Sequence, residues 1–200
     1  MAAPPEVTIK NLTGKYVMNK TLSDDSDDIL KLQGISWFER RANLMFTLKH
    51  YADEGGFEHI DIEQTLSGGI SGTTQYRTLD WEERSINDDV FGALIAQSKR
   101  IKVEEVDDEF LRSGWTEDAV EDGLILAVTR SDTSKSGMEW KTELTWGFEV
   151  LDGERRFARH VKFTSSDKKD GPIFKHHYYD YGKLPLSVIY ISYAHDSSFS

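Results

Sequence analysis

Hydrophobic and polar residues alternate along most of the chain with a period of two, which is typical of strands that bury one face. The clearest case is the segment 138–150, where lysine and glutamate side chains occupy one face. The other face of this predicted strand carries Trp140, Thr142, Leu144, Trp146 and Phe148. We expect this second face to point toward a hydrophobic interior.

A second alternating segment follows a strong hairpin signal. The sequence Leu151-Asp-Gly-Glu154 is typical of a tight turn between antiparallel strands. The segment 156–164 then places on one face Phe157, Arg159, Val161 and Phe163. Arg159 stands out in this row, because a guanidinium group cannot lose its charge and an inward arginine needs an anionic partner.

The partner of Arg159 has three interpretations. It is the carboxylate or enolate of a ligand, held by two parallel hydrogen bonds, or it is an internal Asp or Glu. The third interpretation is that the register differs and Arg159 points outward. Arg77 presents the same case, because Leu79 and Trp81 share its predicted face.

Other parts of the chain carry weaker strand patterns. Further strands are predicted at 14–20, 43–51, 57–65, 73–84, 99–106, 124–130 and 173–181. The segment 87–97 fits either a short helix or part of a strand, and 184–193 fits a final strand or a flap packed on the barrel.

One helical segment interrupts the strands near the start of the chain. Residues 22–28 are rich in Asp and Ser, which accept hydrogen bonds from the free N–H groups at a helix start. An apolar stripe follows from Ile29 to Phe38 and is broken at Gly34. The pattern predicts two short helices that end near Arg40-Arg41.

These elements predict a mainly β fold. About nine to ten sequential strands with short antiparallel connections indicate a single up-and-down β-barrel with a short helical pair between its first two strands. A barrel of this size can enclose one small ligand. We expect residues 11–194 to form this domain, with a flexible lead-in at 1–10 and a flexible tail at 195–200.

Composition narrows the classes of partner. With 38% hydrophobic and 12% aromatic residues, the chain can bury a sizeable core. A formal charge of −11 disfavours nucleic acid and anionic membrane surfaces. The sequence has no cysteine, no recognisable signal peptide at its start and no apolar stretch long enough to span a bilayer. We therefore expect a cytoplasmic protein without a membrane span.

The first part of the chain resembles the fatty-acid-binding proteins, which are lipocalin-like (calycin) β-barrels. Gly14-Lys-Tyr16, then 27–35 with its Leu-Gln-Gly, then Trp37-Phe-Glu-Arg-Arg41, is similar to the family's opening strand and helical pair. The resemblance implies a barrel that holds a hydrophobic ligand. Similar lipocalin-like barrels also serve as cyclases in natural-product pathways.

The chain departs from this family on the last predicted barrel strand. Fatty-acid-binding proteins typically read a ligand carboxylate there with Arg-x-Tyr, whereas this chain has His176-x-Tyr178 and no arginine. An inward His176 beside Tyr178 would donate hydrogen bonds or act as an acid or base, because a histidine pKa lies near neutrality. These two residues are the catalytic candidates, and the alternative is a core histidine with satisfied hydrogen bonds.

The sequence gives no reason to expect a metal or a cofactor. His59, Asp61 and Glu63 lie on one face of a predicted strand, but a solvated outer face with Ile60 and Ile62 inside explains them more simply. Adjacent His176 and His177 point to opposite faces and cannot share one ion within the barrel. No Gly-rich phosphate loop, Gly-x-Ser-x-Gly, His-Glu-x-x-His or Rossmann fingerprint is present.

The favoured function is an intracellular protein that binds a hydrophobic small molecule inside a β-barrel. The alternative is a cofactor-independent cyclase or isomerase, for example a pericyclase, that acts on a hydrophobic natural-product intermediate. The predicted ligand-binding residues are Arg77, Trp81, Trp140, Leu144, Trp146, Phe148, Phe157, Arg159, Val161 and Phe163.

Overall fold

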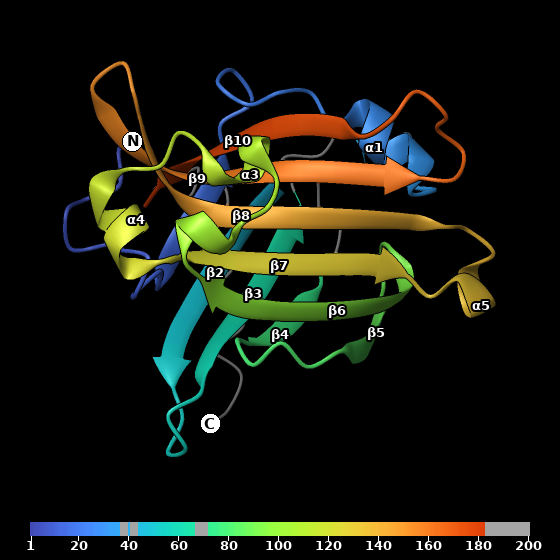
Figure 1. Cartoon of the computed structure of the whole chain (residues 1–200), viewed down its shortest axis with the longest axis horizontal. Coiled ribbons are helices and arrows are strands. Elements are labelled where there is room, and N and C mark those ends of the chain that lie inside the picture. Colours follow the sequence, from blue (N-terminus) through green and yellow to red (C-terminus); the bar gives the residue numbers. More distant parts are fainter. Residues whose placement is uncertain (37–39, 41–43, 67–71, 183–200) are drawn as a thin grey trace, which may run out of the picture.

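The strands of the computed structural model form one curled antiparallel sheet (Figure 1). The structure describes residues 1–36, 40, 44–66 and 72–182. Within them, ten strands pair in the order β4-β3-β2-β1-β10-β9-β8-β7-β6-β5. Consecutive strands therefore pair, except β4 and β5 at the two ends of the order, and β1 also pairs with β10. The predicted mainly β, up-and-down architecture is confirmed. The strands are β1 Gly14–Met18, β2 Leu44–Ala52, β3 Glu58–Leu66, β4 Thr74–Thr78, β5 Arg84–Asp88, β6 Gly92–Ile101, β7 Leu124–Ser131, β8 Trp140–Leu151, β9 Glu154–Ser165 and β10 Ile173–Tyr181.

Short helices lie in three of the connections. Helix α1 (Asp27–Leu32) lies between β1 and β2, with acidic residues in its first turn as expected. The connection between β6 and β7 carries η1 (Val103–Glu105), α3 (Glu109–Arg112) and α4 (Glu117–Asp122), and α5 (Thr133–Ser136) precedes β8. None of the helices among the described residues is long and apolar enough to cross a membrane. Most of the expected second helix and the segment 184–193 lie outside the described residues.

Two predicted strand boundaries are wrong. The segment 73–84 divides into β4 and the start of β5, because Trp81 adopts a positive φ of 65° and turns the chain. The segment 99–106 leaves the sheet after Ile101 and forms η1 instead. The ambiguous segment 87–97 is mostly strand, since β6 begins at Gly92 and buries alternate residues.

Aromatic side chains fill one part of the barrel interior. Tyr16, Phe148, Phe157 and Tyr179 are almost completely buried and pack together with Phe46. This packed cluster fills interior positions of adjacent strands, and Tyr179 lies at its border with a cavity. That cavity extends from this border to α1.

The first ten residues pack on the barrel, which differs from the expected flexible lead-in. Ala3, Val7 and Ile9 join the aromatic core, and the backbone N–H of Ala3 donates to the carbonyl of Arg155 over 2.7 Å. These apolar residues are too few and irregular to form a periodic pattern, so the sequence carried no strand or helix signal here. The segment 195–200 lies outside the described residues.

Candidate functional site

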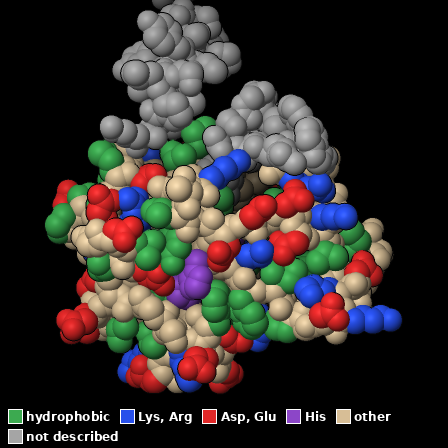
Figure 2. Space-filling model, turned by 90° about the horizontal axis from the view of Figure 1, so that it is seen from above, with side chains coloured by type: hydrophobic (Ala, Val, Ile, Leu, Met, Phe, Trp, Pro, Cys, Tyr) green, Lys and Arg blue, Asp and Glu red, His purple; other side chains and the backbone are tan. Residues whose placement is uncertain are grey.

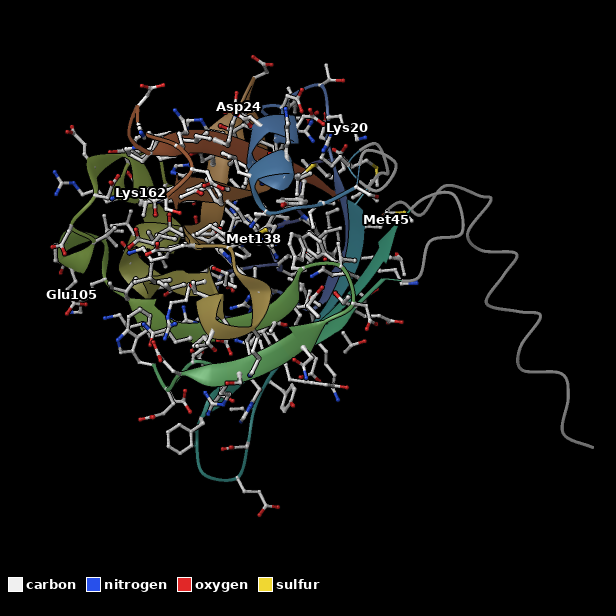
Figure 3. The ribbon with its side chains drawn as sticks, turned by 90° about the vertical axis from the view of Figure 1, so that its right-hand side faces the viewer. Lys20, Asp24, Met45, Glu105, Met138 and Lys162 are labelled. Carbon is white, nitrogen blue, oxygen red and sulfur yellow. The ribbon has the colours of Figure 1, made fainter. Side chains whose placement is uncertain are left out.

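A cavity of about 700 Å³ lies between α1 and the inner faces of the strands. Lys20 and Asp24, labelled in Figure 3, line it near α1. Ile29 and Leu30 of α1 contribute apolar groups to its wall. A cavity of this size holds one drug-sized molecule.

Six of the predicted ligand-binding residues line this cavity: Arg77, Trp140, Leu144, Trp146, Arg159 and Val161. Phe148, Phe157 and Phe163 are completely buried on the predicted inner faces but pack behind the cavity surface. Trp81 lies at the molecular surface, 36% exposed, with the Lys99 Nζ 4.6 Å from its ring centroid. The prediction that Trp81 lines the interior was wrong, because β4 ends at Thr78 and the alternation does not continue past it.

The half-buried Arg159 places its guanidinium group among aromatic rings. Its guanidinium carbon lies 4.1 Å from the ring centroid of Trp146 and 4.5 Å from that of Phe46. Tyr179 hydrogen-bonds the guanidinium, but Nε and Nη2 of Arg159 have no partner. Burial lowers the pKa of Arg159, yet no described carboxylate pairs with it. Cation–π contacts and one hydroxyl group thus stabilise the charge, and Nε and Nη2 remain available as hydrogen-bond donors.

Arg77 adds a second buried charge. It donates to Ser98 Oγ over 3.0 Å and to Gln75 Oε1 over 3.1 Å, while its Nε has no partner. Burial, and next the like charge of Arg159, lower the pKa of Arg77 to about 10, so it stays cationic at neutral pH. Its link to a carboxylate is indirect, because Gln75 in turn donates to Asp88 over 3.0 Å.

Other donors in the lining are also unpartnered. They are the indole N–H groups of Trp140 and Trp146 and the hydroxyl of Thr142. Buried polar groups are normally hydrogen-bonded, so unpaired ones in a cavity wall mark places where a ligand atom or water fits. Asp24, Asp25 and Asp27 line the cavity near α1, whereas Arg77, Arg159 and the unpartnered donors line it along the strands. The strand side is therefore apolar, positively charged and rich in hydrogen-bond donors, which suits a hydrophobic molecule carrying carbonyl or anionic oxygens.

Two lining residues on β10 were missed by the sequence reasoning. His177 and Tyr179 face the cavity, and His177 lies directly opposite Arg159 in the β9–β10 pair. The Nε2 of His177 lies 2.6 Å from the Ser26 hydroxyl oxygen. Burial, and then the charge of Arg159, lower the pKa of His177 to about 4, so its imidazole is neutral at pH 7. Its pairing with Arg159 could have predicted this position, because residues directly opposite each other on neighbouring strands point to the same face.

The predicted catalytic pair, His176 and Tyr178, lies outside the cavity. The expectation that these side chains point inward was wrong, since neighbouring residues on a strand alternate between faces. The Tyr178 hydroxyl donates to Glu149 Oε2 over 2.8 Å, and the His176 ring lies 4.6 Å from that of His160. The structure thus brings the two residues together on the outer wall.

His59, Asp61 and Glu63 lie outside, and Ile60 and Ile62 are buried, as expected. His59 pairs with Asp53 across 2.8 Å.

Comparisons with known proteins found two curated relatives of the chain. It is 30% identical to the probable pericyclase scpY of Mollisia scopiformis, over 80% of this chain and 85% of that protein. It is 26% identical to the pericyclase pydY of an Acremonium species, over 80% of this chain and 88% of that protein. A solved structure, fatty-acid-binding protein 1 of Echinococcus granulosus, shares 12% identity with a TM-score of 0.46, over 86% of this chain and 97% of that one. No protein-family model matches. At this identity and coverage, the chain belongs to the family of these pericyclases.

Proposed function

We propose that this protein is a pericyclase, which closes a ring in a hydrophobic substrate bound in the cavity. The relationship to two pericyclases favours this activity over the simple binding protein that the sequence patterns favoured. Both functions need the same apolar chamber. Catalysis additionally needs groups that interact more strongly with the transition state than with the substrate.

The observation that carries the proposal is the pair of arginines in the cavity wall, Arg77 and Arg159, neither of which contacts a described carboxylate directly. A protein interior stabilises a charge only when it is paired or hydrogen-bonded. Arg159 keeps free donor atoms, and Arg77 places a second cation near it. An oxygen-bearing ligand that carries partial or full negative charge would complete this arrangement.

The chemistry follows from the donors. A pericyclic ring closure converts π bonds into σ bonds within one molecule, so the product is an isomer and neither a proton nor an electron is exchanged. A carbonyl or enolate group conjugated to the reacting double bonds would accept hydrogen bonds from Arg159. As electron density shifts onto that oxygen in the transition state, the fixed guanidinium stabilises it.

The apolar walls serve a second purpose. Leu144, Val161 and Trp140 surround the space beside Arg159 and would force a flexible substrate to fold. Holding two reacting segments together can supply several kcal/mol, about 7–11 in the best oriented systems. Neutral His177 would offer a hydrogen bond without adding a further charge.

The experiment is an isomerisation assay on natural substrate. Deleting the gene in the organism that carries it should cause the uncyclised precursor to accumulate, and an extract of that strain is incubated with the purified protein. We expect one compound to disappear and an isomer of equal mass, with less conjugation in its ultraviolet spectrum, to form. If no compound is converted while a lipophilic compound binds unchanged, the protein is a carrier.

A further inference from the structure

A cluster of metal-ligating side chains lies on the outer wall of the barrel, away from the cavity. Glu149 on β8, His160 on β9 and His176 on β10 present ligand atoms that all lie within 4.8 Å of one another. His160 and His176 are directly opposite in the β9–β10 pair, so both side chains project from the same face. None of the three lines the cavity.

Each of these side chains is oriented by a partner on its far side. Nδ1 of His160 lies 2.9 Å from the Phe110 carbonyl oxygen, which can only accept, so this nitrogen carries the proton and Nε2 faces Glu149. Nδ1 of His176 lies 3.6 Å from Asp24 Oδ2, which leaves Nε2 for the cluster. Metal-binding histidines typically have such a carbonyl or carboxylate on the second ring nitrogen.

The carboxylate is held in the same way. The Tyr178 hydroxyl donates to Oε2 of Glu149, and Oε1 is hydrogen-bonded to Nε2 of His160. Glu149 and His160 are nearly inaccessible, whereas the His176 side chain is 37% exposed. The cluster is therefore enclosed on the protein side and open to solvent at one point, and Figure 2 shows histidine at the surface of the face that carries β10, beside apolar and acidic side chains.

We propose that Glu149, His160 and His176 form a binding site for a divalent transition-metal ion, with Zn²⁺ the best match. Two imidazole nitrogens and one carboxylate oxygen are a common three-residue zinc set, and the solvent-facing side leaves a fourth position for water. The ion would replace the hydrogen bond between Nε2 of His160 and Oε1 of Glu149. These side chains would then move apart, and the proton that they share would pass to solvent.

Such an ion would fasten the insertion between β6 and β7 to the barrel. Phe110 belongs to α3, and the Trp115 ring that follows it stacks on His160 at 4.0 Å between centroids. Asp24 belongs to the segment before α1. The ion would thus join three strands and two connections, and this site does not depend on the proposed ring closure.

The test uses Co²⁺ as a spectroscopic probe of the full, tag-free chain after treatment with a chelator. We expect the visible absorption of four-coordinate Co²⁺ to saturate at one ion per chain and to disappear when Zn²⁺ is added. His176→Ala should abolish the signal. Tyr178→Phe, which removes only the outer partner of Glu149, should weaken Co²⁺ binding by about 10–100-fold.

The matched control is His59→Ala, which removes a surface histidine that also faces a carboxylate, Asp53. It should bind Co²⁺ as the wild type does. Zn²⁺ should raise the melting temperature of the wild type and of His59→Ala but not of His176→Ala. Absence of the Co²⁺ spectrum at millimolar metal, or an unchanged spectrum in His176→Ala, would overturn the proposal.

Discussion

Arg159 and Trp146 lie directly opposite each other in the β8–β9 pair, and the guanidinium carbon of Arg159 stands 4.1 Å from the centroid of the indole ring. This stacking places a permanent charge against an aromatic face, an interaction worth about 0.5–2 kcal/mol. That amount is small beside the cost of burying a charge, so the arginine is poised to gain from an anionic or carbonyl ligand.

Replacing Arg159 by Met should separate charge recognition from apolar contact. The probes are 1-anilinonaphthalene-8-sulfonate, an apolar anion, and N-phenyl-1-naphthylamine, which lacks the sulfonate. A hydrogen bond to a charged group contributes about 1.5–3 kcal/mol, so affinity for the anion should fall about 10–100-fold. Fluorescence titration should show little change for the neutral probe.

The control for this variant is Arg130→Met, because Arg130 is an exposed arginine that pairs with Glu83. It should bind both probes as the wild type does. Equal losses for the anion and the neutral probe in Arg159→Met would mean that the arginine shapes the cavity instead of reading charge.

The same substitution should not destabilise the ligand-free protein. Arg159 is half-buried and has no described carboxylate partner, so its charge loses hydration without gaining an ion pair. Urea unfolding should therefore give Arg159→Met an equal or higher free energy of unfolding than the wild type. A large loss of stability would show that the contacts of the guanidinium with the surrounding aromatic rings already offset the cost of its desolvation.

Much of the interior was predictable because β8 and β9 alternate cleanly and a short turn joins them. Trp140, Leu144, Trp146, Arg159 and Val161 line the cavity as expected. The alternation could not show where the packed core ends and the cavity begins, because Phe157 and Arg159 are two residues apart and therefore point to the same face of β9. Only the aromatic packing around Tyr16 and Phe46 decides that boundary.

The β10 strand shows why the site itself was harder to predict. His176, His177, Tyr178 and Tyr179 are all polar-aromatic, so their pattern has no apolar phase. The turn between β9 and β10 did not fix the pairing register of β10. From the sequence, His176 and Tyr178 are therefore expected to face inward, whereas His177 and Tyr179 do so. The cluster on the outer wall was also hidden, because its members are far apart in sequence and meet only through strand pairing.

His177 should make stability depend on pH. Its pKa is about 4 in the folded protein against an ordinary value of about 6.5, so the unfolded chain binds a proton first as the pH falls. Its contribution to stability is therefore full above about pH 6.5 and is lost progressively down to about pH 4, by about 3 kcal/mol at most.

Urea titrations between these pH values measure the effect. His177→Gln should show a shallower decline of unfolding free energy over this window than the wild type. Identical slopes for the two proteins would mean that His177 is solvated and does not have the lowered pKa.

The most direct test of the central claim is the rate of isomer formation by wild type, Arg159→Met and His59→Ala on the precursor from the deletion strain, at saturating substrate. If the guanidinium stabilises charge that develops during ring closure, Arg159→Met should lower the maximal rate by about 100-fold or more, as loss of one such donor does in other enzymes, while His59→Ala keeps the wild-type rate. An unchanged maximal rate in Arg159→Met would contradict the account.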